Sequence, residues 1–138
     1  MEAESRKAIT IRISSPGGSV YEALSMIGRI KSSKCQIITE GYGQIMSAAV
    51  LLLACGNKRR ISQYSWFMHH ESSMMIGGST SELKDELMQM EREEQTWCTW
   101  MEEFSGRDRD FWYNAAQKRN FYLSAQECLD TGIVDEVI

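Results

Sequence analysis

Residues 8–39, AITIRISSPGGSVYEALSMIGRIKSSKCQIIT, carry the pattern that decides the fold. Residues 8–13 alternate and are rich in β-branched side chains, which predicts a strand. The SSPGGS turn follows, and apolar residues then recur at helical spacing over about 20–31. Residues 35–39 predict a second strand. Strand, helix and strand within about thirty residues form a βαβ unit, so we expect parallel strands joined by a right-handed crossover.

The rest of the chain continues to alternate short strands with helices, within a single domain over residues 1–138. The further elements that we expect are a helix that begins at Ser47, a strand over 66–69, a loop at 76–78, a long helix over 80–104, a short helix over 108–118, a strand over 121–123, a helix capped by Ser124 and Glu127, and a final strand over 133–138.

Composition narrows the class of protein. Hydrophobic residues make up 43% and charged residues 25% of the 138 residues, which suits a globular core. The net charge of −4 argues against nucleic-acid binding, and we interpret the short basic run at 58–60 as a solvated loop. The longest apolar run, residues 48–55, is far shorter than the ~20 residues that cross a bilayer. We therefore expect neither a nucleic-acid nor a membrane partner.

The four cysteines are scattered without the spacing of metal ligands. We therefore expect no metal and no other cofactor, and we interpret the thiols as reduced and packed. The first residues are polar and charged, unlike a signal peptide, which predicts a cytoplasmic protein.

The helix expected over 80–104 is unusually long, roughly 37 Å at 1.5 Å per residue. Glu94 interrupts its apolar stripe, and Met88 and Trp100 extend the apolar surface to a second face. A helix with more apolar surface than one small core can cover indicates packing against another subunit. The alternative is a core-facing helix whose middle is wet. The stripe consists of Leu83, Leu87, Met90, Trp97, Met101 and Phe104.

Ser47 is the first candidate for chemistry. Ala48 and Ala49 follow it, and such small residues let a substrate approach the N-terminus of the expected helix. Free N–H groups and the positive end of the helix dipole favour a developing anion there. Ser47 could attack a carbonyl while the next N–H receives the oxyanion. The alternative is a serine that only caps the helix.

The chain has two histidines, which are adjacent. His69 is the last residue of the expected strand 66–69, and His70 follows it directly. Neighbours on a strand face opposite sides, so one can face the core and the other a cleft, where it would be the obvious base for Ser47. Gly17 and Gly18 lie at the carboxyl end of the first strand, the edge where open α/β sheets bind ligands. The alternative for the glycines is an ordinary turn.

Four segments in this order resemble the ClpP family, the proteolytic subunits of the Clp protease. The segments are ITIRISSPGGSV, GQIMSAAVLLLACG, SWFMHHES and NFYLSAQECLDTGIVDEVI. The resemblance implies an α/β fold, a ClpP/crotonase-like spiral of ββα units with a long protruding handle helix. It also implies a serine endopeptidase that cleaves peptides or unfolded proteins inside an oligomeric chamber.

The resemblance assigns roles to single residues. Ser47 would be the nucleophile and His70 the general base. The N–H groups of Gly18 and Ala48 would form the oxyanion hole.

Further roles implied by the resemblance concern substrate and assembly. Gly17, in the segment after the first strand, and Gly77 and Gly78, in the loop at 76–78, would hold a substrate as an added β-strand. The helix over 80–104 would be the handle that joins two rings face to face, so a homo-oligomer is expected.

The chain departs from the family pattern at the third triad position, where Asn120 occupies the place of the usual aspartate. An asparagine can accept a hydrogen bond from an imidazole but brings no full charge. Three outcomes follow: a slow Ser-His-Asn enzyme, which we favour, recruitment of another acid such as Asp108 or Asp110, or a subunit that has lost activity.

The chain also begins just before its first strand, where the family has a further N-terminal segment. We interpret it as an N-terminally short relative, which makes docking of an AAA+ unfoldase doubtful. Two rival functions stay open. One is a non-catalytic ClpP-like ring subunit, and the other is an acyl-CoA hydratase or isomerase of the crotonase type, which shares the spiral architecture and the paired N–H groups.

Overall fold

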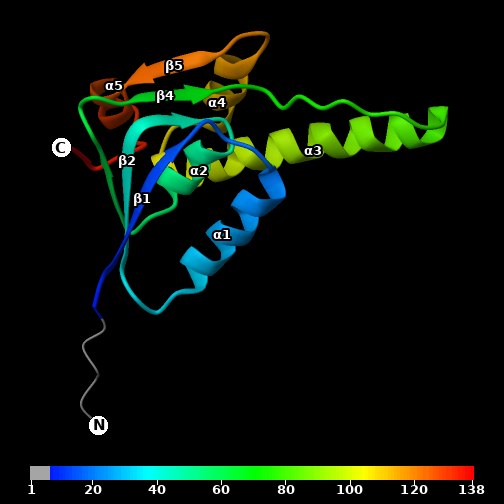
Figure 1. Ribbon diagram of the computed structural model, residues 1–138. Helices are drawn as coiled ribbons and strands as arrows, with labels where there is room; N and C mark the ends of the chain where they lie inside the picture. Colours follow the sequence, from blue (N-terminus) through cyan, green and yellow to red (C-terminus); the bar gives the residue numbers. More distant parts are fainter. Residues whose placement is uncertain (1–6) are drawn as a thin grey trace.

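The computed structural model describes residues 7–138 and shows a mixed α/β fold around one six-stranded sheet (Figure 1). The expected α/β class and the long helix are confirmed. The elements in chain order are β1 (Ile9–Ser15), α1 (Val20–Ser32), β2 (Ile37–Met46), α2 (Ala49–Ala54), β3 (Lys58–Ile61), β4 (Trp66–His69), α3 (Thr80–Ser105), α4 (Arg109–Ala116), β5 (Phe121–Ser124), α5 (Ala125–Asp130) and β6 (Glu136–Val137).

Strand β2 is the centre of the sheet, whose order is β5-β4-β2-β3-β6 with β1 also paired to β2. The strands β1 and β2 are parallel, as the βαβ pattern predicts. The first part of β2 pairs with β3, and residues 44–46 pair with β4. Only the pair β4 and β5 is antiparallel within the described part of the sheet.

The prediction that the second strand ends at residue 39 is wrong, because β2 continues to Met46. Gly43 lies inside the strand with φ 71°, and the register of β1 against β2 shifts between Ile13 and Ser15 at the same level. A glycine in a strand commonly marks such a bulge. The bend turns the end of β2 toward β4, and so positions the residue that follows it.

The interpretation of residues 58–60 as a solvated loop is also wrong. They form β3, which lies between β2 and β6. The basic side chains pair with carboxylates on both sides of β3. Arg59 pairs with Asp135, just before β6, at 2.7 Å, and Arg60 pairs with Glu40 of β2 and Glu136 of β6. Burial opposes the charge of Glu40, but hydrogen bonds from Tyr42, Arg12 and Arg60 outweigh it and lower the pKa of that carboxyl.

The core is built around α2, whose Val50, Leu51 and Leu53 are fully buried. Burying each such side chain contributes about 1.5–3 kcal/mol. Phe67 from β4 and Trp112 from α4 are also fully buried. Each helix within residues 7–138 is too short or too polar to span a lipid bilayer. All four cysteines are free thiols, three of them buried.

Helix α3 begins at a capping box formed by Ser79 and Glu82 and ends at Gly106 with φ 77°, so its bounds are close to the expected 80–104. Within α3 the buried residues are Cys98 and Met101, in its second half. The first half extends beyond the rest of the molecule, and the segment that leaves β4 runs beside it (Figure 1). Leu87 and Met88 in that half are 54% and 63% exposed.

Candidate active site

Ser47 lies in the turn that joins β2 to α2, with a left-handed φ of 55°. The helix therefore begins two residues later than predicted, at Ala49. The N–H of Ser47 donates to the carbonyl of Met68 on β4 at 2.9 Å, and its carbonyl accepts from Val50 at 3.1 Å. A non-glycine residue rarely adopts a positive φ, and such strain is typical of functional sites. These bonds hold the turn so that its half-buried hydroxyl reaches a cleft.

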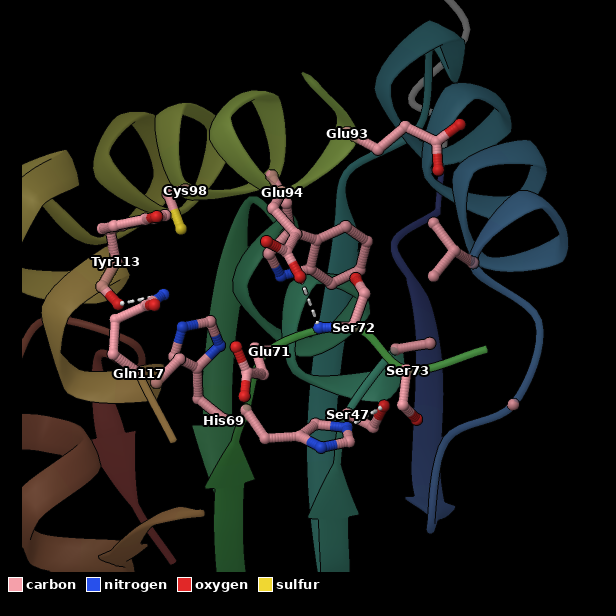
Figure 2. Close-up of a pocket in the computed structure, with 16 residues that line it drawn as sticks. Ser47, His69, Glu71, Ser72, Ser73, Glu93, Glu94, Cys98, Tyr113 and Gln117 are labelled. Carbon is pink, nitrogen blue, oxygen red and sulfur yellow. Dashed lines mark hydrogen bonds between the residues drawn. The ribbon is translucent and has the colours of Figure 1, made fainter. Parts of the chain in front are cut away.

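His70 follows directly after β4, and its Nε2 lies 2.7 Å from Ser47 Oγ (Figure 2). The pairing of β4 with the end of β2 brings the two residues together, although 23 positions separate them. Both side chains are half-buried, so a substrate can reach them. The distance is suitable for proton transfer from the hydroxyl to the imidazole.

His69 points the other way, into the core, and is 3% exposed. Its Nε2 lies 2.9 Å from the carbonyl of Trp112, and its ring meets the Trp112 ring edge-on at 5.5 Å. Burial lowers the pKa of His69 to about 4. The two rings therefore point to different partners, as the alternation along a strand predicts: His70 bonds to Ser47, whereas His69 is buried against Trp112 and only borders the cleft.

Gly17 packs directly against the Ser47 turn. A Cβ at Gly17 would lie 2.7 Å from Ser47 Cβ and 2.9 Å from the carbonyl oxygen of Met46, and φ at Gly17 is +103°. Only glycine fits this position without moving the turn. The N–H of Gly17 donates to Ser15 Oγ at 3.1 Å.

Gly18 and Ala48 line the cleft together with Ser47. Neither of their N–H groups donates to a protein acceptor within residues 7–138. Two N–H groups beside a serine hydroxyl are donors of the kind that an oxyanion hole requires. The structure thus brings four of the expected residues, Ser47, His70, Gly18 and Ala48, to one cleft.

The cleft is partly open and spans about 850 Å³ when the solvent at its mouth is included. Three carboxylates line it, without a lysine or arginine. We call Glu71, Glu93 and Glu94 the cleft carboxylates. Burial is the main cause that raises the pKa of Glu94. A hydrogen bond from Tyr21 is the main cause that lowers the pKa of Glu93.

Sequence reasoning did not find the cleft carboxylates. Glu94 was visible only as the interruption of an apolar stripe, which was the one available signal. Trp97 and Tyr113 add aromatic walls to the cleft.

Asn120 is exposed, does not line the cleft, and forms no hydrogen bond with His70. The register of the antiparallel pair β4 and β5 nevertheless ends at His69 opposite Phe121. The next opposed pair in that register is His70 and Asn120. Asp108 and Asp110, the alternative acids considered for the triad, lie at the start of α4, where Asp108 Oδ1 accepts from the N–H of Asp110 at 2.7 Å. Neither residue lines the cleft.

Gly77 and Gly78 lie just before the N-terminus of α3, at its protruding end (Figure 1). They do not line the cleft, so the structure does not bring them to Ser47. Gly78 instead packs against the Glu82 side chain of the capping box. Within residues 7–138, no group of three or more histidine, cysteine or acidic side chains is placed to hold a metal.

Comparison with known proteins points to one family, the Clp proteases. A family model described as Clp protease matches residues 1–138. ATP-dependent Clp protease proteolytic subunit 2 of Corynebacterium efficiens is 30% identical, over 94% of this chain and 66% of the relative. ATP-dependent Clp protease proteolytic subunit 1 of Prochlorococcus marinus is 31% identical, over 100% of this chain and 71% of the relative. The ATP-dependent Clp protease proteolytic subunit of Bacteroides thetaiotaomicron is 30% identical, over 96% and 60%. The chain spans about two thirds of the length of these relatives.

Proposed function

This chain belongs to the Clp protease family, and from that premise we propose that it is a serine endopeptidase whose nucleophile is Ser47. The observation that carries the proposal is the 2.7 Å contact between Ser47 Oγ and His70 Nε2 in a cleft open to solvent. An alcohol and a base at this distance, beside two free N–H groups, are the parts that acyl transfer needs.

In the proposed reaction, Ser47 Oγ bonds to the carbonyl carbon of a peptide while its proton passes to His70 Nε2. The electron pair of the C=O bond moves to oxygen, where the N–H groups of Gly18 and Ala48 stabilise it. The C–N bond then breaks, and His70 gives its proton to the leaving amine. Water then attacks the acyl carbon of the ester while His70 takes its proton. The bond between that carbon and Ser47 Oγ breaks, the acid leaves, and His70 returns the proton to Ser47 Oγ.

The third member of the triad is proposed to be Asn120. When Nε2 of a neutral His70 accepts the proton of Ser47, its Nδ1 carries a hydrogen that needs an acceptor. The register of β4 and β5 supports Asn120, because its amide oxygen would come opposite His70 when the ladder extends by one pair. An amide supplies no full charge to the imidazolium, so we expect slow turnover.

A peptide or an unfolded protein is the proposed substrate. An extended chain could add to the sheet beside Gly17 and Gly18, at the carboxyl end of β1. The position of Gly77 and Gly78 does not support a role for them at this cleft in the isolated chain.

A homo-oligomer that encloses the site is the proposed assembly, with α3 in the interface. Leu87, Met88 and Met75 at the protruding end are 54%, 63% and 101% exposed, and such apolar surface favours burial against another copy. The free thiols fit a reducing compartment, and we propose the cytoplasm. The names of the relatives state ATP dependence; for this chain we propose peptide hydrolysis alone. Light scattering that shows only a ~16 kDa monomer would contradict the assembly.

The decisive experiment measures hydrolysis of fluorogenic peptides by the purified chain and by Ser47→Ala, together with labelling by a fluorophosphonate probe. We expect labelling of Ser47 in the wild type and neither labelling nor hydrolysis in the variant. Equal hydrolysis rates for the two proteins would refute the assignment.

The second candidate is a non-catalytic subunit of a Clp protease assembly. The absence of any carboxylate hydrogen-bonded to His70 within residues 7–138 favours it. No labelling of a folded wild type at Ser47 would support this candidate. Membership of a family of proteolytic subunits supports either one over the crotonase-type alternative.

A further inference from the structure

The segment 71–78 is held to the rest of the molecule at one point. It leaves β4, runs beside α3, and takes part in no strand ladder. Every residue in it is exposed. Within residues 7–138, its one hydrogen bond to another part of the chain runs from the N–H of Ser72 to Glu94 Oε1, at 2.8 Å (Figure 2).

This hydrogen bond lies close to His70. The ladder with β5 ends at His69, and the bond from Ser47 N–H reaches the carbonyl of Met68. The backbone of His70 therefore lies between two attachments: the strand ladder, which ends at His69, and the hydrogen bond from Ser72 to Glu94. If that contact is lost, no other hydrogen bond within residues 7–138 ties segment 71–78, on the carboxyl side of His70, to the rest of the molecule.

The surroundings of Glu94 disfavour a charged carboxylate. Its side chain is half-buried in the cleft, and this burial is the main cause that raises the pKa of Glu94, with smaller contributions from repulsion by Glu71 and Glu91. No lysine or arginine pairs with it within residues 7–138. The contact with the Ser72 N–H is the one interaction that offsets these costs, since an N–H to carboxylate bond is stronger than a neutral one.

We propose that Glu94 is a positioning residue, which fixes the main chain at Ser72 so that the His70 imidazole stays directed at Ser47. The inference rests on the proposed function for its catalytic consequence. It also makes a structural claim that does not depend on activity. The alternative is that Glu94 is a solvated side chain that interrupts the apolar face of α3 and positions nothing.

Two substitutions separate the hydrogen bond from the charge. Glu94→Ala removes the acceptor, whereas Glu94→Gln keeps an acceptor oxygen and removes the charge. Glu86→Ala is the matched control, because Glu86 is an exposed glutamate on the same helix outside the cleft. All three proteins are measured as the full chain, with urea unfolding to confirm that each one folds.

Activity gives the first set of results. In Glu94→Ala, measured with an uncharged peptide, we expect kcat and the rate of fluorophosphonate labelling at Ser47 to fall about 10- to 100-fold, with KM little changed, because the reacting groups are misplaced rather than removed. On the same uncharged peptide, Glu94→Gln should keep most of the wild-type kcat and labelling rate, because its amide oxygen still accepts from the Ser72 N–H. Glu86→Ala, outside the cleft, should remain close to the wild type. A Glu94→Gln variant as impaired as Glu94→Ala would overturn the proposal, because charge rather than positioning would then be responsible.

Structure gives the second set, and it holds even for an inactive wild type. The Ser72 amide should exchange its hydrogen at least about tenfold faster in Glu94→Ala than in Glu94→Gln. The ¹⁵N resonances of the His70 ring should move in Glu94→Ala and stay in Glu94→Gln. Unchanged exchange and unchanged resonances in Glu94→Ala would refute positioning by Glu94. A wild type that shows these structural effects but no labelling at Ser47 would refute only the peptidase assignment.

Discussion

Replacing Gly17 by alanine should disable the proposed site while leaving all of its functional groups in the chain. The added Cβ would lie 2.7 Å from Ser47 Cβ and 2.9 Å from the Met46 carbonyl oxygen. Ordinary contact begins at 3.4 Å, so the Ser47 turn must retreat by about 0.7 Å. The φ of +103° also strains any L-residue, at a cost of about 1–2 kcal/mol.

The effect on activity follows from the contact between Ser47 and His70. A retreat of about 0.7 Å along the 2.7 Å hydrogen bond would stretch it to about 3.4 Å, beyond good hydrogen-bond geometry. Because a misplacement of about 1 Å can cost 10²-fold, we expect the rate of Ser47 labelling to fall roughly 10- to 100-fold. The free energy of unfolding should fall by about 1–3 kcal/mol.

Gly28→Ala is the matched control, since it makes the same chemical change where the structure has room. Gly28 lies inside α1, and a Cβ there would meet nothing within 4 Å. Alanine should raise the free energy of unfolding by about 0.5–1 kcal/mol and leave labelling unchanged. Urea unfolding and fluorophosphonate labelling measure both variants. A Gly17→Ala protein that reacts at the wild-type rate would show that the turn is not packed as described.

Three further predictions concern charge and protonation. Asn120→Asp should raise kcat for peptide hydrolysis by about tenfold or more if residue 120 comes opposite His70, since the reverse change lowers kcat about 10⁴-fold in chymotrypsin-like proteases; an unchanged or lower kcat would place residue 120 elsewhere. His69 is neutral in the folded state with a pKa of about 4, whereas the unfolded chain takes up the proton near pH 6.5, so stability should be lost as the pH falls from about 6.5 toward 4. That loss amounts to about 2 kcal/mol at pH 5 and should disappear in His69→Gln, which urea unfolding across this pH range would test. The cleft carboxylates predict faster hydrolysis of peptides with lysine or arginine near the scissile bond than of acidic ones, with a ratio that declines as salt is added; a ratio independent of salt would argue against an electrostatic origin.

The sequence determined the parts of this protein that depend on neighbours along the chain. The first strand, its glycine turn and the helix after it follow from periodicity over residues 8–39, and β1 and β2 pair in parallel as expected. The capping box of Ser124 and Glu127 follows from two side chains three residues apart. The opposite directions of His69 and His70 follow from the alternation of a strand. Local rules suffice here because each interaction lies within one turn or one pleat.

Tertiary structure decided what residues distant in the chain do together. The basic segment 58–60 becomes β3 only because β2 and β6 supply hydrogen bonds and carboxylates on both sides, which no local pattern reveals. The length of β2 depends on its change of partner from β3 to β4 at the bend near Gly43. The contact of Glu94 with Ser72 requires α3 to return beside the segment that leaves β4. A strand needs a partner before its backbone groups are satisfied, and that partner is chosen by the fold rather than by the strand itself.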